Sequence, residues 1–269
     1  MSTNLRPAAV AAMFYPESGA VLARQVAQML AAAPRALVQR PKAIIVPHAG
    51  YVYSGPIAAS IYAPLAALRN SVRRIVLLGP THRVAITGLA VPSSSAFATP
   101  LGNVPVDQEA LAALVDLPQV VVDDAAHADE HSLEVQLPFL QTIFGEFSLL
   151  PFAVGQASPE EVAEVLDRLW GGDETLIVVS SDLSHYLPYA AARQADAQTA
   201  QHIVDLDPTL HHGQACGATP VNGLLLAARR HAMHAQLLDL RNSGDTAGDK
   251  ARVVGYGAFA LYEAEQHAH

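Results

Sequence analysis

Short apolar runs alternate along the chain with longer segments of helical periodicity. The apolar runs are rich in β-branched residues, which is typical of strands buried on both faces. They predict strands at Ala43–Val46, Arg74–Leu78, Leu149–Val154, Thr175–Ser180 and Val253–Leu261. The segments between predict helices at Ser18–Ala33, Gly55–Leu68, Leu133–Phe144, Pro159–Trp170, Ala190–Leu206 and Pro220–His231. This alternation indicates an α/β fold whose mostly parallel central sheet carries helices on both faces.

The composition is that of a folded protein with an acidic surface. Apolar residues make up 51% of the 269 residues and charged residues only 15%, which suits a large core and argues against long disordered tails. The net charge is −9 and no basic cluster stands out, so we expect no nucleic-acid partner. No repeat or linker divides the chain, and residues 1–269 are predicted to form a single domain.

Nothing in the sequence predicts export or membrane insertion. No apolar run approaches the roughly 20 residues of a membrane helix, and residues 1–16 lack the pattern of a signal peptide. The single cysteine excludes an internal disulfide. We therefore expect a cytoplasmic protein without a membrane partner.

Three of the predicted strands are each followed by a histidine. His48, His82 and His185 come just after the first, second and fourth strands. In open α/β sheets ligands bind at the carboxyl ends of the strands, so these side chains are expected to face one centre. Neutral imidazole coordinates divalent metals, although each histidine taken alone also fits a structural role. Because no local zinc motif is present, such a site would combine distant segments.

Two further residues near these strand ends have both a chemical and a structural interpretation. Cys216 lies just before the helix expected from Pro220, and a helix N-terminus stabilises the thiolate that binds metals or attacks electrophiles. A lone cysteine is also often a small buried apolar residue. Asp182 lies three residues before His185 and either orients that histidine or caps a turn.

The segment that precedes the helix predicted at Leu133–Phe144 also has two interpretations. Ser132 is placed to cap this helix, and Glu130 suits its positive end. In the alternative, His131 faces the pocket as a hydrogen-bond donor or proton carrier. The local sequence does not distinguish between the two.

Several ordered blocks of the chain resemble those of the Memo family, of the AmmeMemoRadiSam system protein B type. The resemblance also includes Arg6-Pro7 with Phe14-Tyr15-Pro16 near the start and Tyr256-Gly257-Ala258 near the end, so it spans nearly the whole chain. The fold of this family is similar to that of class III extradiol dioxygenases, which use iron to open catechol-type rings. The main blocks are Pro47-His48-Ala49-Gly50-Tyr51, Gly79-Pro80-Thr81-His82, Asp129-Glu130-His131-Ser132, Ser180-Ser181-Asp182-Leu183-Ser184-His185 and Cys216-Gly217.

The resemblance implies a set of metal ligands. His48 and His82 match the two histidine ligands of the dioxygenases, and Cys216 falls where their glutamate ligand is expected. Thiolate in place of carboxylate makes the site softer, which favours copper or zinc without excluding iron. It also adds a ligand that can be oxidised. We expect iron or copper, with zinc as an alternative.

The resemblance also implies catalytic roles and partners. His185 matches an acid/base histidine, Asp182 belongs to the same motif, and His131 matches a histidine near the substrate. These residues predict a metal-dependent redox enzyme with a phenolic substrate. One alternative is a non-catalytic module that binds a peptide or small ligand in the same cleft, and a weaker one is a metal-free hydrolase with Cys216 as nucleophile. Family association suggests a radical-SAM protein as a pathway partner.

Overall fold

The apolar runs form strands at the predicted places in the computed structural model, which describes residues 4–34 and 39–264. Two strands match the prediction residue for residue, and the other three are longer by one or two residues. The predicted strands are β2 (Ala43–Val46), β3 (Arg74–Pro80), β8 (Ser148–Val154), β9 (Thr175–Ser180) and β12 (Val253–Tyr262). Strands that were not predicted are β1 (Leu5–Arg6), β4 (Leu89–Val91), β5 (Ala96–Thr99), β6 (Gly102–Pro105), β7 (Val120–Val122), β10 (His185–Leu187) and β11 (His234–Asn242).

The central sheet is mixed. Its strand order is β10-β12-β2-β9-β3-β8-β4-β7, with β11 paired to β12. The four strands β2, β9, β3 and β8 are parallel to one another. On either side of this group, β12 runs antiparallel to β2, and β4 runs antiparallel to β8. The α/β class is confirmed, but the expected mostly parallel sheet is not, because hydrophobic runs do not encode strand direction. A small separate sheet contains β1, β5 and β6.

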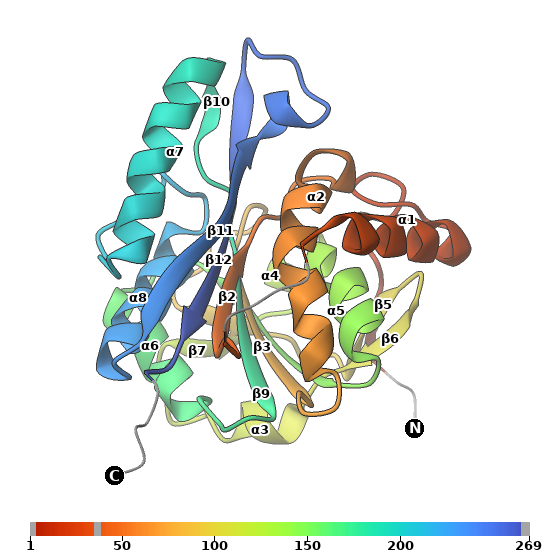
Figure 1. The fold of residues 1–269 in the computed structure, drawn as a ribbon. Helices are drawn as coiled ribbons and strands as arrows, with labels where there is room; N and C mark the ends of the chain where they lie inside the picture. The colour runs from red at the N-terminus through yellow and green to blue at the C-terminus, as the bar shows by residue number, and fades with distance from the viewer. Residues whose placement is uncertain (1–3, 35–38, 265–269) are drawn as a thin grey trace.

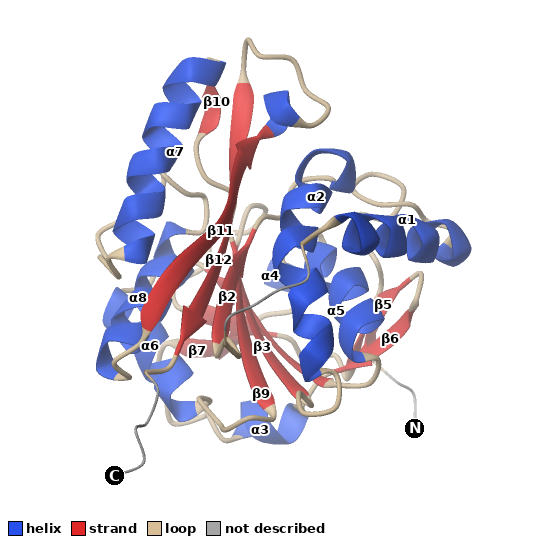
Figure 2. Ribbon diagram, in the orientation of Figure 1, coloured by secondary structure: helices blue, strands red, loops and turns tan. Residues whose placement is uncertain are grey.

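Helices cover both faces of the central sheet (Figures 1 and 2). Helices α1 (Gly19–Ala32), α2 (Tyr51–Tyr62) and α5 (Leu137–Phe144) lie on one face, and α6 (Pro159–Arg168), α7 (Tyr189–Val204) and α8 (Ala218–Arg230) lie on the other. Shorter helices are α3 (Gln108–Ala112) and α4 (Ala125–Ala128), with 3-10 turns η1 (Ala63–Leu68), η2 (Glu134–Gln136) and η3 (Ser243–Asp245). In the part of the chain that the structure describes, no helix is both long and apolar enough to cross a membrane.

Helix α6 shows how local sequence sets an element boundary. Ser158 caps the helix by accepting from the backbone N–H of Glu161, while Ser158 N donates to the Glu161 carboxylate at 2.7 Å. Pro159 follows at the first helical position, where its missing N–H costs nothing. The apolar face of α6 packs on α8, which in turn contacts β3 and β9.

The order of the parallel strands decides where the site lies. β9 pairs in parallel with β2 on one side and with β3 on the other. The carboxyl ends of these three strands are therefore neighbours at one edge of the sheet. All side chains of β2 and β9 are buried, so the strands hold this edge rigidly against both helical layers. The loops that follow the strands supply most of the chemically active side chains.

Candidate metal centre

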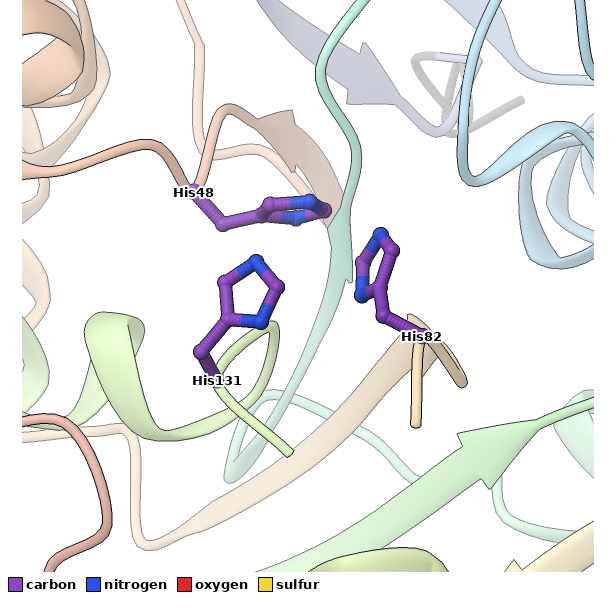
Figure 3. A group of neighbouring side chains, drawn as sticks. All are labelled: His48, His82 and His131. Carbon is purple, nitrogen blue, oxygen red and sulfur yellow. The ribbon is translucent and has the colours of Figure 1, made fainter. Parts of the chain in front are cut away.

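Three histidines from separate chain segments converge at the carboxyl edge of the sheet (Figure 3). His48 comes from the loop after β2, His82 follows β3, and His131 lies between α4 and η2. The ring centroids of His48 lie 5.3 Å from those of both His82 and His131, and the last two are 4.5 Å apart. One ring nitrogen from each lies within 4.8 Å of the others, so the three could hold one metal ion.

The hydrogen bonds around Ser180 determine which nitrogen of His48 carries the ring proton. Ser180 Oγ donates its only proton to the carbonyl oxygen of Ser132 at 2.7 Å, because a carbonyl only accepts. It accepts from the side-chain amide of Gln136 at 2.8 Å. Ser180 Oγ therefore also accepts from His48 Nδ1, 2.8 Å away, so Nδ1 holds the proton. The lone pair of His48 is on Nε2, where a metal ion would bind.

Glu130 fixes the ring of His82 in a similar way. His82 Nδ1 lies 2.9 Å from Glu130 Oε1, and the backbone N–H of His82 donates to Oε2 at 2.5 Å. Burial alone would raise the pKa of Glu130, but hydrogen bonds from His82 and Ser132 hold this pKa at about 2. The carboxylate is thus ionised and only accepts, so Nδ1 of His82 carries the proton. The lone pair on Nε2 is left for a ligand.

The other rings of the cluster are neutral near pH 7. Burial, with His131 and His82 close by, holds the pKa of His48 well below its ordinary value. Burial also lowers the pKa of His131 to about 4. Nδ1 of His131 lies 3.3 Å from Glu130 Oε1 but makes no hydrogen bond to the described residues. Uncharged rings with a free nitrogen are in the state that coordinates a metal ion.

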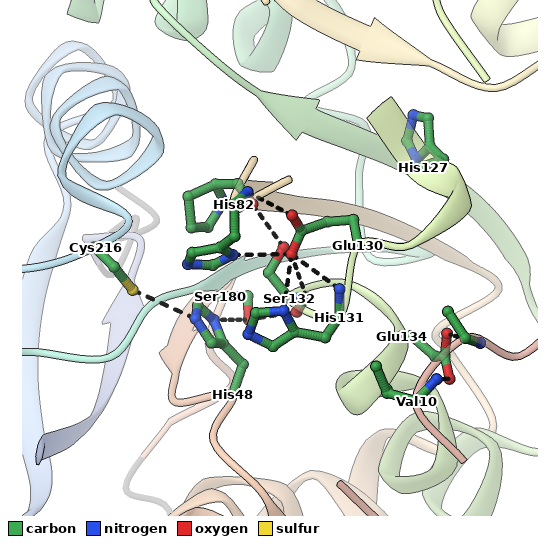
Figure 4. A network of polar contacts seen from close by, with 12 residues as sticks. Val10, His48, His82, His127, Glu130, His131, Ser132, Glu134, Ser180 and Cys216 are labelled. Carbon is green, nitrogen blue, oxygen red and sulfur yellow. Dashed lines mark hydrogen bonds and ion pairs between the residues drawn. The ribbon is translucent and has the colours of Figure 1, made fainter. Parts of the chain in front are cut away.

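Cys216 lies beside His48, just before α8 (Figure 4). Its Sγ is 3.3 Å from His48 Nε2, and since Nε2 carries the lone pair, the thiol donates to it. Burial, with the Asp182 carboxyl nearby, raises the pKa of Cys216 to about 12. The expectation that the helix N-terminus stabilises a thiolate is not confirmed for the metal-free chain, because burial outweighs the hydrogen bonds from Ser181 and from the backbone of Asp182 and Gly217 that lower this pKa.

Asp182 supports the loop of His48. Its Oδ1 accepts from the backbone N–H of His48 at 2.8 Å. Burial raises the pKa of Asp182 to about 7, against hydrogen bonds from the backbone of His48 and Ala49. The expected bond from Asp182 to His185 is not found among the residues described. Instead, His185 Nδ1 donates to the carbonyl of Leu183 at 2.9 Å, because Leu183 lies within reach of the same turn.

His185 lies at the edge of the site rather than in the cluster of three. It begins the short strand β10 and lines a cavity together with His131. Because Nδ1 donates to a carbonyl, the lone pair of the ring is on Nε2. Burial lowers the pKa of His185, so the ring is uncharged near pH 7 and is able to accept a proton.

Sequence reasoning missed the polar residues that orient the histidines. Ser132, expected to cap a helix, instead donates to the carbonyl of Pro80 at 2.9 Å, and η2 begins after Leu133. This contact requires glycine at position 79, where a Cβ would lie 2.7 Å from Ser132 Oγ. Glu130, expected only to suit a helix N-terminus, is 2% exposed and holds His82. The available signals were its position beside His131 and its place in the block Asp129-Glu130-His131-Ser132.

The available donors fit a transition-metal ion. His48 and His82 each offer Nε2, and each is oriented by a hydrogen bond on its other nitrogen, as in known metal sites. His131 or Cys216 would supply a third ligand, from a neutral nitrogen or a sulfur atom. Nitrogen and sulfur donors favour iron, copper or zinc over magnesium or calcium. Among the residues that the structure describes, the three histidines bring their ligand atoms within 4.8 Å of one another, whereas Cys216 is not part of such a group and approaches His48 alone, at 3.3 Å.

Fold and site together define an α/β protein with a histidine-rich, metal-compatible centre at the carboxyl ends of parallel strands. The chain matches the Memo-like protein family over residues 6–260 and belongs to that family. Its relatives include MEMO1 family proteins of Ignicoccus hospitalis and Aquifex aeolicus. Each is 37% identical, and each match covers 94% of this chain and 97% of the relative. A third, from Methanosarcina barkeri, is 36% identical and matched over its full length, with 96% of this chain covered.

A solved structure supports the fold alone. An uncharacterized protein from Escherichia coli K12 superposes with a TM-score of 0.55 over 81% of this chain and 99% of that protein. Its sequence identity is 14%. The likeness to class III extradiol dioxygenases therefore stays a prediction.

Proposed function

We propose that the chain binds one redox-active transition-metal ion and acts on phenolic molecules. The observation that carries the proposal is the orientation of His48 and His82, whose Nε2 lone pairs are fixed by Ser180 and Glu130. Either Cys216 or His131 completes the ligand set. Iron or copper bound there would supply redox chemistry toward a phenol or catechol, whereas zinc would supply only a Lewis acid.

The residues around the cluster suit a phenolic ligand. A cavity of about 630 Å³ beside His131 and His185 is lined by aromatic side chains, among them Phe14, Tyr53 and Tyr256. Aromatic walls favour a planar ring, and the two histidines lie where its hydroxyl groups would reach. His185, with a free Nε2, removes a proton from a hydroxyl. Where Cys216 completes the ligand set, His131 hydrogen-bonds the oxygen.

A substitution at His185 tests this role separately from metal binding. Iron- or copper-loaded wild-type protein is expected to bind 4-nitrocatechol with the spectrum of the deprotonated ligand and to take up oxygen with catechols. His185→Gln is expected to keep its metal content and lose about 10²-fold or more in oxygen uptake, the usual contribution of acid/base catalysis. Metal-loaded wild-type protein that neither binds nor consumes any catechol would overturn the proposal.

The second candidate is a non-catalytic module that binds a peptide in the same cavity. The observation in its favour is the exposure of apolar side chains near the cavity: Tyr53 is 40% exposed and Tyr186 is 62% exposed, and both line it. Aromatic residues of this kind are enriched where proteins bind one another. Peptide binding that survives chelation and a His82→Ala substitution would favour this candidate over the enzyme.

A further inference from the structure

Two cavities each include one histidine of the cluster in their lining. One is the cavity of about 630 Å³ that ends on His131 and His185. The other, of about 450 Å³, ends on His82 and Cys216. Within residues 4–34 and 39–264, the two cavities share no lining residue. Because the rings of His82 and His131 are 4.5 Å apart, both cavities nevertheless end on the same centre.

The walls of the two cavities differ in chemistry. The larger cavity, which we call the aromatic cavity, carries tyrosines and the charged side chains Asp249 and Arg252. The smaller one, which we call the neutral cavity, has no Asp, Glu, Lys or Arg among its described lining residues. Apolar and uncharged polar groups form it: Pro80, Thr81, Ala85, Ile86, Val154, Gly155, Gln156, Ala157 and Thr219, with His212 at one side. Such walls favour an uncharged molecule, because a charge would be desolvated there without a partner.

Backbone hydrogen bonds hold one wall of the neutral cavity in place. Gln156 N donates to the carbonyl of Ile86 at 2.9 Å, and Gly88 N donates to that of Gln156 at 2.8 Å. Gly155 packs so closely that a Cβ there would lie 2.2 Å from the Ile86 carbonyl oxygen. The loop after β3 is thus joined to the end of β8. The cavity is preformed and needs no ordering of a loop to admit a ligand.

We propose that the centre has two separate entrances, the aromatic cavity for the organic ligand and the neutral cavity for a small uncharged co-ligand. The two molecules then reach the centre without displacing one another. The inference rests on the proposed function for the identity of the organic ligand. The separation of the entrances rests only on the cavities and is testable in the metal-free chain.

Two exposed alanines provide a matched pair of variants. Ala85 lines the neutral cavity, and Ala247 lines the aromatic cavity. Both are exposed, so tryptophan at either position partly fills one entrance without disturbing the core. Because Cys216 is the only cysteine of the chain, its alkylation by iodoacetamide reports access through the neutral cavity without ambiguity. Mass spectrometry of the metal-free full-length protein gives the rate.

Ala85→Trp is expected to slow alkylation of Cys216 about tenfold, equivalent to about 1.4 kcal/mol in the barrier, and Ala247→Trp to leave it unchanged. Equal slowing in both variants, or in neither, would overturn the separate entrances. Iodoacetate tests the preference for uncharged molecules. Its rate relative to iodoacetamide is expected to be lower than the same ratio for free cysteine, and an equal ratio would contradict that preference.

Binding of 4-nitrocatechol to the metal-loaded protein is the reverse test. Ala247→Trp is expected to weaken it about tenfold, equivalent to about 1.4 kcal/mol, while Ala85→Trp leaves it unchanged. Weaker binding in Ala85→Trp alone would show that the organic ligand enters through the neutral cavity, and this would overturn the inference. If the wild-type protein binds no nitrocatechol while the alkylation rates still differ as expected, the proposed function fails and the separate entrances stand.

Discussion

Two buried glutamates, four residues apart, have opposite roles in this molecule. Glu134 is fully buried and accepts from Arg6, the Tyr15 hydroxyl and two backbone N–H groups of the N-terminal segment. Glu130 is 2% exposed and accepts from the ring and backbone of His82 and from the backbone of two following residues. Figure 4 shows the two carboxylates facing different parts of the chain.

The two glutamates differ in the role of the groups that donate hydrogen bonds to them. The described partners of Glu134 only stabilise the fold. Arg6, for example, also donates to the carbonyls of His127 and Glu130. The carboxylate therefore attaches the N-terminal segment to the rest of the molecule. Glu130 instead holds a histidine whose other nitrogen is free and faces a cavity. Burial and charge alone do not mark a functional glutamate, whereas a partner with an unused ligand atom does.

The largest effect is expected on stability from Glu134→Gln. The substitution leaves the buried Arg6 without its counter-charge, and breaking such a pair costs about 3–5 kcal/mol. Urea unfolding is expected to show this loss in the free energy of unfolding, with metal content per folded chain unchanged. Loss of metal from folded Glu134→Gln protein would contradict the conclusion that Glu134 stabilises the fold while Glu130 acts on the metal site.

Glu130→Gln, the matched substitution, is expected to act mainly on the metal. Glutamine keeps one acceptor oxygen but loses the charge, and its NH2 group faces an N–H donor of His82 or of the following residues. The proton on His82 Nδ1 is then held less firmly, and metal affinity is expected to fall about 10- to 100-fold. The free energy of unfolding is expected to fall less than in Glu134→Gln. Competition with a coloured chelator measures the affinity. Unchanged affinity in Glu130→Gln would show that this residue is as structural as Glu134.

The pH dependence of zinc affinity distinguishes the two ligand sets. Burial raises the pKa of Cys216 to about 12, so the thiol loses a proton when it binds metal. With Cys216 as ligand, affinity is expected to rise about tenfold per pH unit between about pH 7.5 and 8.5, above the ordinary pKa of histidine. With His131 instead, affinity is expected to stay flat, because burial lowers the pKa of His131 to about 4. Cys216→Ser abolishes the slope only in the first case.

The smallest effect is expected from Tyr15→Phe. It removes one of the donors to Glu134 but leaves Arg6 and the backbone N–H groups in place. The expected loss in the free energy of unfolding is about 1.5–3 kcal/mol, the usual range for one hydrogen bond to a charged group. Metal affinity is expected to stay at the wild-type value. A loss in the free energy of unfolding larger than that of Glu134→Gln would contradict the conclusion that the carboxylate contributes more than the hydroxyl.

Much of the fold was predictable because the buried strands are continuous apolar runs. β2 and β9 match residue for residue. The sequence did not predict β4 (Leu89–Val91) and β7 (Val120–Val122), since three residues show no periodicity. It also did not predict β11 (His234–Asn242), which is only half-buried and contains Asp239 and Arg241. Strand direction depends on pairings between distant segments, which the local pattern does not contain.

The positions of His48 and His82 were predictable because strand ends meet at one edge of a parallel sheet. The role of Glu130 was not, because a glutamate before a helix is typical of a favourable end charge. Its true partner, His82, lies 48 residues earlier, and only the folded structure brings the two together. The role of Ser180 was not predictable either, because the strand pattern shows it only as the polar last residue of a strand.

Metal content of untagged protein, measured by mass spectrometry for the wild type and His48→Ala, tests the central claim most directly. His48 is fully buried, and its Nε2 is fixed toward the cluster by the bond from Nδ1 to Ser180. The wild type is expected to hold about one iron or copper ion per chain, and folded His48→Ala protein to hold none. An equal metal content in both, or none in the wild type even after anaerobic reconstitution, would contradict the metal centre.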